Sequence, residues 1–437
     1  MADTTEAPTR RAMAMALAAA LLGWMFDGFE MGLFPLVARP ALRELMGPEA
    51  ALDIGTWFAR IMAAFLVGAA CGGVLFGWLG DRIGRIRAMV WSVFTYAIFS
   101  GLCGFVAAPW QLAILRFIAS LGMGGEWALG VALVMEIWPA RHRPMLAGLI
   151  GAASNVGFLL IALLGLGLSQ VIKDLGILLT DAGMPQAWVD PLLANSGWRL
   201  LLFLGAAPAV LTFFIRLFVP ESPRWQHAAA TAPRNRVIDI FRGGLATPAL
   251  LGATLSAIAL LGTWGSVQWI PAWADKMTGG QMPTAKSLAQ ICSGLGAVVG
   301  CILGALFAQW TSRRWGYFTL ALTSLAACQY LFRAPAEFGV AYLAMVFVVG
   351  GLTAAFYGWL PLYLPELFPT RIRATGQGFA FNSGRLLAAA GTLGAGGLLN
   401  WFGEDYARMC AVISLVYILG IVFIWFCPET KNRPLPE

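Results

Sequence analysis

Long apolar stretches separated by short polar segments run through the whole chain of 437 residues. A helix that crosses a membrane needs about 20 mostly apolar residues. On that basis we expect twelve membrane-spanning helices, over residues 12–37, 57–80, 88–107, 109–137, 144–168, 199–219, 248–272, 287–311, 316–333, 338–366, 375–399 and 407–427. The pattern therefore predicts an all-α membrane protein.

The polar segments divide the predicted helices into two sets of six. A polar stretch at 220–246 lies between the sixth and seventh spans. It predicts an N-terminal six-helix bundle over 1–219, a linker over 220–246 and a C-terminal six-helix bundle over 247–437. The polar segment at about 169–198 is expected to form a long outer loop.

Two short segments repeat the same pattern. They read Glu136-Ile-Trp-Pro-Ala-Arg141-His-Arg143 and Glu366-Leu-Phe-Pro-Thr-Arg371-Ile-Arg373. Each copy follows a long apolar stretch and precedes the next one. Since a repeat at about half the chain length indicates duplication, we expect two similar halves.

Composition supports the membrane interpretation. The chain is 59% hydrophobic and 12% charged, about half the charged fraction of a soluble globular protein. The seven cysteines lie in apolar stretches without metal-ligand spacing, and only two histidines exist. We therefore expect no metal and no cofactor. An enzyme is disfavoured because no nucleophile–base pair is evident.

The distribution of positive charge predicts the orientation. Most of the 29 Lys and Arg residues fall in segments on the same side as the N-terminus. Because cytoplasmic loops carry the excess of positive charge, both termini and the linker are expected in the cytoplasm, in the cell inner membrane. This bias accounts for the net charge of +7, so no nucleic-acid partner is needed. We expect a monomer in the lipid bilayer.

A polar loop over 77–87 links the second and third predicted helices on this side and carries several charges. Asp81 can bind an arginine and a helix N-terminus across the interface between the halves. The plainer interpretation, a positively charged turn, explains the arginines but not the full spacing. The mirror segment Thr311–Gly316 lacks an aspartate, so its relay is expected to be weaker or wired differently. The residues expected in this gating charge relay are Asp81, Arg82, Arg85, Glu136, Arg141, Glu221, Arg224, Arg313, Glu366 and Arg371.

Charged residues inside predicted spans are costly, so they indicate function. Glu30 lies about 10 Å below the outer surface, and Arg116 has about the same depth. The two could form an ion pair that breaks when Glu30 takes up a proton, with Asp27 on the same helix face. The alternative is a fixed pair that only locks helices together.

Arg385 lies near the middle of the predicted eleventh helix, and Asn382 precedes it on the same face. An arginine at this depth can bind a carboxylate with two hydrogen bonds. Its alternative partner is Glu126, which would make the arginine structural. Glu126 itself is assigned equally to packing or gating and to the transport path. In the internal repeat Asn155 falls on Arg385.

Aromatic residues on the predicted seventh and tenth helices could line the substrate site. The set is Trp264, Trp269, Tyr357, Trp359 and Tyr363, with Gln268 among them. Individually each is more typical of packing or of an interfacial belt. Together they could form a wall suited to a planar or hydrocarbon-bearing acid.

Several of these motifs together resemble the major facilitator superfamily. The 77–87 loop is similar to its loop signature, and Arg116–Trp127 is similar to its fourth-helix motif. The segments 220–225, 365–371 and 428–437 resemble the sugar-porter branch. Asp27-Gly-Phe-Glu30 resembles the Asp-Gly-Phe-Asp of aromatic-acid and sialic-acid proton symporters. The resemblance covers essentially the whole chain.

The resemblance implies two six-helix bundles that rock around a site at the membrane midplane. We expect proton-coupled symport of a small organic anion, such as a monocarboxylate, an aromatic acid or a sugar acid. Asp27 and Glu30 would carry the proton and Arg116 would tune Glu30. The alternative is a sugar or polyol transporter, although sugar porters carry paired glutamines where this chain has only Gln268. The expected substrate-binding residues are Arg385, Asn382, Asn155, Glu126, Gln268, Trp264, Tyr357 and Trp359.

Overall fold

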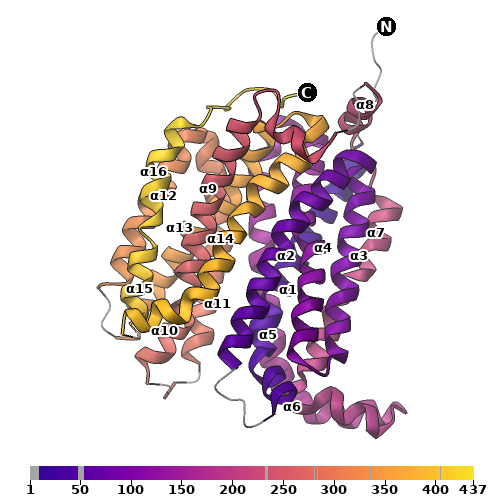
Figure 1. The fold of residues 1–437 in the computed structure, drawn as a ribbon, viewed down its shortest axis with the longest axis vertical. Helices are drawn as coiled ribbons and strands as arrows, with labels where there is room; N and C mark the ends of the chain where they lie inside the picture. Colours follow the sequence, from indigo (N-terminus) through magenta and orange to yellow (C-terminus); the bar gives the residue numbers. More distant parts are fainter. Residues whose placement is uncertain are drawn as a thin grey trace.

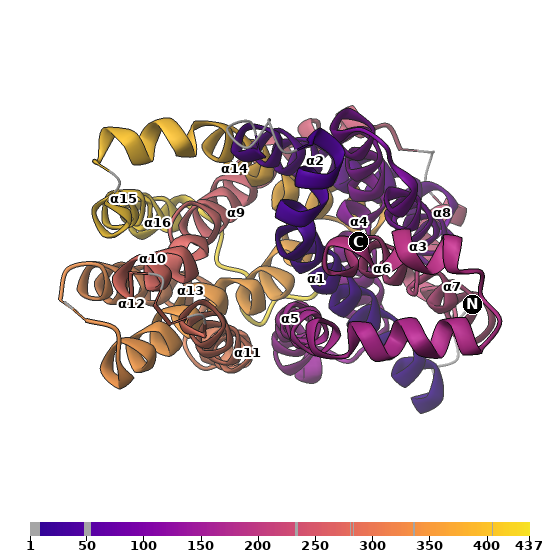
Figure 2. The same ribbon diagram turned by 90° about the horizontal axis from the view of Figure 1, so that it is seen from below.

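The computed structural model describes residues 9–47, 54–231, 235–279, 281–282, 284–334, 337–403 and 405–437. Within these ranges the chain folds into helices joined by short turns, without a β-strand. The indigo-to-magenta half and the red-to-yellow half stand side by side as two helical bundles (Figure 1). The view along the bundle shows the same division (Figure 2). The prediction of an all-α protein with two bundles is confirmed.

The N-terminal bundle contains the first seven helices. They are α1 (Arg10–Met46), α2 (Ile54–Ile83), α3 (Arg85–Leu102), α4 (Pro109–Ile137), α5 (Arg143–Asp181), α6 (Gln186–Leu204) and α7 (Ala209–Phe218). The predicted span 199–219 is formed by the end of α6 together with α7. A turn at 205–208 separates these two helices.

The C-terminal bundle follows a short helix, α8 (Pro223–Thr231), in the linker. Its helices are α9 (Ala246–Gly265), α10 (Ile270–Met277), α11 (Ala285–Trp310), α12 (Arg313–Leu331), α13 (Val340–Tyr363), α14 (Arg373–Trp401), α15 (Tyr406–Ile413) and α16 (Val416–Phe423). Two predicted spans are interrupted. The span 248–272 bends after α9, and 407–427 is divided between α15 and α16.

Nine helical segments in the described ranges are long and apolar enough to cross a membrane. The other three predicted spans fall on α6 with α7, on α12 and on α14. α14 is the most informative of these, because it carries Gln377, Asn382 and Arg385 in a long helix. Its polar residues face the rest of the protein, since all three are buried.

The expected outer loop at 169–198 is wrong, because most of this segment is helical. α5 continues to Asp181 and α6 begins at Gln186. α6 is itself broken at Ala194–Gly197, where Asn195 and Ser196 have positive φ angles. The helical arm formed by 172–194 runs sideways across one end of the bundle in Figure 1. Apolar residues among the charged ones let this segment continue the helix, so polarity alone mispredicted a loop.

The two halves meet along two lines of helices. α2 packs against α14, and α5 packs against α11 and α13. A Cβ atom at Gly73 would lie 2.1 Å from Nδ2 of Asn382, and one at Gly378 would lie 2.2 Å from the carbonyl oxygen of Gly73. Glycine is therefore required at both positions for α2 and α14 to approach this closely.

Both copies of the repeated motif lie at one end of the bundle, which we call the motif end. The Trp138 indole N–H donates to the Met13 carbonyl oxygen, 3.0 Å away, which brings the start of α1 there. The Thr370 amide donates to the Pro436 carbonyl oxygen at 3.2 Å, which brings the C-terminal segment there. The motif end is at the top of Figure 1, and the helical arm lies at the opposite end.

Candidate functional site

Glu30 of α1 and Arg116 of α4 lie in contact inside the N-terminal bundle. Oε1 of Glu30 accepts hydrogen bonds from Nη1 of Arg116 and from the Ser100 hydroxyl. The Arg116 guanidinium also lies over the rings of Phe34 and Phe65, at 5.3 and 4.7 Å from their centroids. The expected pair is therefore present, enclosed by aromatic side chains. Its part in proton movement stays a prediction.

A second charged cluster lies where the two halves meet. It consists of Asp27 on α1, Glu126 on α4 and Arg385 on α14, each at most 2% exposed. Asp27 lies within electrostatic reach of both other groups. In the described part of the chain, neither carboxylate makes a hydrogen bond, and Nη1 of Arg385 has no partner. Nor does an ion pair join Arg385 to Glu126, so the structural alternative for Arg385 is not realised here. We call these three residues the central cluster.

The sequence makes specific room for this cluster. A Cβ atom at Gly23 of α1 would lie 1.6 Å from Oε1 of Glu126. Any side chain at this position would therefore displace the Glu126 carboxyl group. α1 thus carries Asp27 and, one turn earlier, the glycine that admits Glu126.

Such a cluster is costly unless something completes it. Removing an ionised group from water costs several kcal/mol even after relaxation, and burial of polar groups without hydrogen bonds adds to this. The three residues therefore need a proton, water or a ligand. A lone arginine beside two acids can exchange one carboxylate partner for another.

Four aromatic side chains pack beside the central cluster. The rings of Trp127 on α4 and Phe381 on α14 are stacked, with centroids 3.9 Å apart and planes 13° apart. Trp24 lies against both rings, and Tyr357 of α13 meets the edge of Phe381 at 6.4 Å. The Arg385 guanidinium lies 5.7 Å from the centroid of Phe381. Charge and aromatic surface from both halves therefore meet at one place.

Buried charges also join the halves at the motif end. Nη1 of Arg85 donates to Asp81 at 2.5 Å, and its Nη2 donates to Glu136 at 3.0 Å. Glu136 in turn accepts from Nη1 of Arg373 in the other half at 2.9 Å. All of these side chains are buried.

Asp81 adds a further link between the halves, to the N-terminus of α14. It accepts from the backbone N–H of Ala374 at 3.1 Å and from that of Thr375 at 2.8 Å. The Thr375 hydroxyl donates to it at 2.5 Å. This is the bridge to a helix N-terminus that the sequence predicted for Asp81, and it closes the motif end.

Comparison with known proteins places the chain in a family. The sequence profile of the Major Facilitator Superfamily matches residues 12–392. The chain belongs to the major facilitator superfamily. It is therefore a transporter of the multi-pass membrane type and not an enzyme.

Two relatives and one solved structure extend this comparison. The facilitator is 27% identical to the cis,cis-muconate transport protein of Acinetobacter baylyi, over 95% of this chain and 94% of the relative. It is 25% identical to the sialic acid transporter NanX of Escherichia coli, over 92% of each chain. The solved structure of the proton:xylose symporter XylE matches with a TM-score of 0.73 at 19% identity, over 97% of this chain and 98% of that one. At that identity the structural match shows the fold alone.

Two residues expected to bind substrate are placed differently by the structure. Trp359 is wholly buried within the C-terminal half, where its indole N–H donates to the Arg313 carbonyl oxygen at 3.1 Å. Its ring packs on Tyr317 and Tyr363. The expectation that Trp359 lines the site is wrong, because this tryptophan fills the core at the motif end.

Asn382 is also occupied with packing. Its Nδ2 donates to the carbonyl oxygens of Gly124, at 3.2 Å, and of Gly378, at 3.0 Å. Only the acceptor oxygen Oδ1 is left without a partner. Since an acceptor repels a carboxylate, Asn382 cannot help Arg385 bind an anion in this conformation, and it serves instead as a link between the halves.

The other expected lining residues are spread over the interface. Tyr357 reaches the central cluster through Phe381, as described above. Asn155 donates to Gly151 and to Sγ of Cys301, on the contact between α5 and α11. Trp264 packs against apolar clusters that include residues of the N-terminal half. Gln268 is exposed beyond the end of α9. Their substrate contacts stay predictions.

The second-half relay differs from the first, as its sequence predicted. Arg313 pairs with Glu366 at 2.8 Å, as Arg85 pairs with Glu136. Gln309, four residues before Arg313, stands where Asp81 precedes Arg85. Gln309 only approaches Arg313 of its own half, at 3.5 Å. The expected relay residue Glu221 accepts the backbone N–H groups of Arg85 and Ile86 at the start of α3.

Four arginines assigned to the relay make no ion pair in the described ranges. Arg82, Arg141, Arg224 and Arg371 are exposed. Arg82 lies over the Trp78 ring instead, at 5.1 Å. In the second copy of the repeat it is Arg373 that enters the buried network, a residue the predicted relay omitted. The repeat itself carried the signal, because Arg373 is its last matched position.

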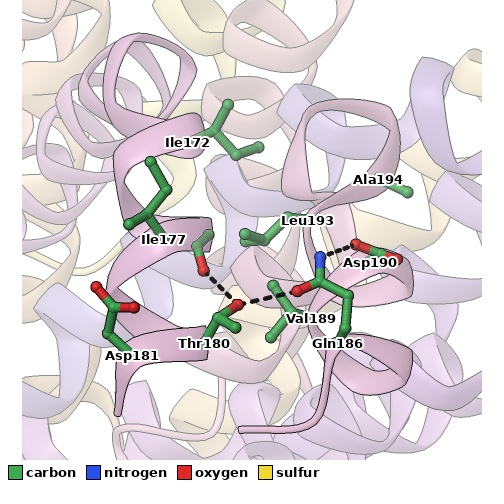
Figure 3. Close-up of a pocket in the computed structure, with 10 residues that line it drawn as sticks. Ile172, Ile177, Thr180, Asp181, Gln186, Val189, Asp190, Leu193 and Ala194 are labelled. Atoms are coloured by element: carbon green, nitrogen blue, oxygen red, sulfur yellow. Dashed lines mark hydrogen bonds between the residues drawn. The ribbon is translucent and has the colours of Figure 1, made fainter. Parts of the chain in front are cut away.

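A surface groove of about 670 Å³ lies elsewhere, on the helical arm (Figure 3). It runs between the end of α5 and the start of α6. Thr180 and Gln186 are hydrogen-bonded across it at 3.1 Å, and Gln186 donates to Asp190 at 2.6 Å. None of the central-cluster residues lines this groove, so it is separate from the site between the halves.

Proposed function

We propose that this facilitator is a proton-coupled symporter of a small organic anion, a monocarboxylate, an aromatic acid or a sugar acid. The observation that carries the proposal is the central cluster. It contains two buried carboxyl groups and one buried arginine, and the arginine comes from the other half of the protein. A neutral sugar would leave Nη1 of this arginine without a charged hydrogen-bond partner, whereas the carboxylate of an organic anion supplies one.

Coupling follows from competition for Arg385. Asp27 lies within electrostatic reach of Arg385. When Asp27 is ionised it holds the guanidinium, and when it is protonated it leaves the guanidinium to the substrate carboxylate. Anion binding therefore requires a proton, and release of the proton favours release of the anion.

Glu30 and Arg116 provide a second place for a proton. Protonation of Glu30 would free Arg116 from its carboxylate partner and loosen α1 against α4. Since Asp27 and Glu30 lie one turn apart on α1, a change in the charge of one carboxyl group alters the electrostatic environment of the other. We assign proton coupling to Asp27 and Glu30, with Arg116 tuning Glu30 and Glu126 assisting Asp27.

Alternating access would be controlled at the motif end. We propose that this end faces the cytoplasm of a bacterial inner membrane, because most Lys and Arg residues fall in its loops. The network of Arg85, Glu136 and Arg373 would then close the inner side while the outer side admits substrate. Opening of the inner side requires these ion pairs to separate.

The relatives support an organic acid as substrate. One is a cis,cis-muconate transport protein and another a sialic acid transporter, and both named compounds are carboxylic acids. Each match covers more than nine tenths of both chains. The substrate carboxylate is therefore expected at Arg385.

Uptake into proteoliposomes tests the proposal. Purified protein is offered labelled cis,cis-muconate, benzoate, sialic acid and xylose, with and without an inward proton gradient. We expect the gradient to drive accumulation of at least one acid and not of xylose. Uptake of xylose alone would contradict the anion assignment, and acid uptake that ignores the gradient would contradict proton coupling.

Two variants of the arginine separate binding from folding. Arg385→Lys keeps the charge but loses the paired hydrogen bonds of the guanidinium, so we expect weaker acid binding with a normal melting temperature. Arg385→Gln removes the charge and should abolish saturable acid uptake. Unchanged acid affinity in both variants would contradict the role of Arg385.

A further inference from the structure

We propose that the stacked pair Trp127 and Phe381 selects planar, conjugated carboxylates, whose flat face replaces the stack when the halves separate. This inference rests on the proposed function, because it names the class of organic anion that Arg385 receives. It assigns a specificity role to Trp127, which directly follows Glu126 in the sequence, and to Phe381, which lies one helical turn before Arg385.

The pair is a contact between the two moving parts. Trp127 belongs to α4 and Phe381 to α14, and they are 2% and 1% exposed. Their planes are nearly parallel, at 13°, with centroids 3.9 Å apart. Any rocking that separates α4 from α14 must therefore break this stack and uncover two large aromatic faces.

A planar substrate can replace the stacking contact that is lost when the rings of Trp127 and Phe381 separate. A flat conjugated ring or diene can lie against an aromatic face as the partner ring did, whereas a puckered saturated ring cannot present a flat π surface. The planar substrate thus stabilises the separated arrangement more than a saturated acid of the same size and charge. Such differential binding is what lets a ligand shift a conformational equilibrium.

The charges are placed to orient such a ligand. Arg385 follows Phe381 by one helical turn, about 6 Å along the axis, and its guanidinium lies over the same ring at 5.7 Å. A carboxylate on Arg385 therefore leaves the attached ring beside Phe381. The arrangement fits an acid whose carboxyl group is joined directly to its conjugated system.

Trp24 offers a second polar contact. Its ring meets Phe381 edge-on, with centroids 6.1 Å apart and planes 70° apart. The side chain is 3% exposed, yet its indole N–H has no hydrogen-bond partner in the described ranges. A buried donor of this kind indicates an acceptor that arrives with the ligand, such as a second carboxylate or a ring oxygen.

The test compares matched acids in proteoliposomes under an inward proton gradient. Benzoate and cyclohexanecarboxylate have the same charge and ring size, and they differ in planarity. We expect the wild type to bind benzoate on the order of three- to ten-fold more tightly, as judged by KM and by competition. Equal KM values for the two acids would overturn the inference and leave the proposed function standing. Transport of neither acid nor of any other organic anion would overturn both.

Variants connect the preference to the stack. Trp127→Leu should raise the KM for benzoate and leave that for cyclohexanecarboxylate nearly unchanged, so that their ratio approaches one. Trp127→Phe keeps a ring and should retain most of the preference. Trp110→Leu is the matched control, because Trp110 lies on the same helix and is 56% exposed.

Phe381→Leu provides a second, independent test of the proposal if Trp127→Leu does not fold. It should reduce the benzoate preference in the same way, with kcat little changed. A loss of affinity for both acids by the same factor, in either folded variant, would mean that the rings only pack the interface and would overturn the proposal.

Discussion

Glu136 of the N-terminal half accepts a hydrogen bond from Arg373 of the C-terminal half, with 2.9 Å between Oε1 and Nη1. The same oxygen accepts from Arg85 of its own half at 3.0 Å. Arg373 also donates to the carbonyl oxygen of Pro436 at 2.7 Å, so the C-terminal segment is tied to the same network. One carboxylate thus holds both halves and the end of the chain together at the motif end.

Removal of Arg373 should open the motif end. In Arg373→Ala the buried Glu136 keeps Arg85 as its one ion-pair partner among the described residues, and breaking a buried pair costs about 3 kcal/mol or more. We expect a large shift towards the conformation with separated motif-end helices. Spin labels at Arg141→Cys and Trp310→Cys, with Cys71 replaced by serine, should report a longer distance between the halves.

Arg371→Ala is the control for this change. Arg371 lies two residues earlier in the same motif and is exposed, without an ion pair in the described part of the chain. An exposed charge of this kind contributes at most about 1 kcal/mol. An equal shift in both variants would show that general loss of positive charge, and not the link to Glu136, opens the motif end.

The two halves should respond differently to matched substitutions in their loops. Asp81→Asn weakens three hydrogen bonds to the N-terminus of α14. Hydrogen bonds to a charged group are worth roughly 1.5–3 kcal/mol each. We therefore expect substrate uptake to fall about ten-fold or more. Gln309→Ala should have little effect, because in the described part of the chain the Gln309 side chain is hydrogen-bonded only to Arg313 of its own half. Initial uptake rates at matched protein amounts measure both. Equal losses would contradict the one-sided closure.

The sequence shows why only one half makes this bridge. Asp81 accepts from the backbone N–H groups of Ala374 and Thr375, just after the second copy of the repeat. The matching positions after the first copy are Pro144 and Met145, and proline has no N–H to donate. The missing aspartate in the second half was therefore predictable as a broken relay. The significance of the missing backbone N–H at Pro144 could be recognised only once the structure showed that α2 packs against α14.

Residue counts along the predicted helices indicate which charged residues lie at the same depth in the membrane, but depth alone does not establish which of them are in contact. Glu30 and Arg116 were matched correctly from depth, because both positions follow from counting residues from a helix end. The grouping of Asp27 with Glu126 depended on Gly23, whose missing side chain becomes relevant only once α1 is packed on α4. The sequence-based assignment of Trp359 to the substrate site was wrong because a helix face buried within one bundle has the same composition as a face at the interface between the two bundles. The turn at 205–208 between α6 and α7 and the break after α9 were hidden within continuous apolar segments.

Glu30 and Arg116 should show strong energetic coupling. Arg116→Leu leaves the buried Glu30 carboxylate without its charged partner, so we expect destabilisation by about 3–5 kcal/mol. The double variant Glu30→Gln with Arg116→Leu should recover a large part of that loss, because no unpaired charge is left. Thermal unfolding in detergent, followed for the wild type, for Glu30→Gln and Arg116→Leu alone and for the double variant, measures the coupling. Additive effects of the two substitutions would contradict a direct pair.

The same glutamate should separate exchange from accumulation. If Glu30 carries a coupling proton, Glu30→Gln should lose uphill uptake driven by a proton gradient but still exchange labelled for unlabelled acid. Ser100→Ala removes only the hydroxyl that donates to Glu30 and should keep both activities. Gradient-driven accumulation at the wild-type level in Glu30→Gln would exclude Glu30 as the proton site.

Gly23 should tolerate no side chain. In Gly23→Ala the new Cβ atom would meet Oε1 of Glu126 at 1.6 Å, so the carboxyl group must leave its place beside Asp27. We expect acid uptake to fall at least ten-fold, while the helix itself gains roughly 0.5–1 kcal/mol from alanine. Gly391→Ala on α14 is the control, since nothing lies within 4 Å of its Cβ position. Normal uptake in Gly23→Ala would show that the position of Glu126 is unimportant for transport.

Two glutamates at the motif end occupy equivalent places and differ in charge behaviour. Glu221 accepts the first backbone N–H groups of α3, and Glu429 accepts those of Arg313 and Arg314 at the start of α12. Burial raises the pKa of Glu221 above its ordinary value of 4.5, and its hydrogen bonds offset this only in part. Burial acts in the same direction on Glu429, but the backbone donors of Lys431, Arg314 and Arg313 outweigh it and lower its pKa.

Opposite pH dependences should follow from these two directions. Because the pKa of Glu429 is lowered on folding, its stabilisation is fully present above pH 4.5 and is lost as the pH falls through the folded-state pKa. Glu429→Gln should therefore lower the melting temperature at pH 7, and its difference from the wild type should shrink below pH 4.5.

Glu221 should show the opposite dependence. Its raised pKa stabilises the fold below pH 4.5, and this contribution disappears as the pH rises through the folded-state pKa. Glu221→Gln keeps an acceptor oxygen and should melt like the wild type at pH 7. Melting curves of both variants between pH 4 and pH 7 measure this contrast, and equal, pH-independent losses would contradict it.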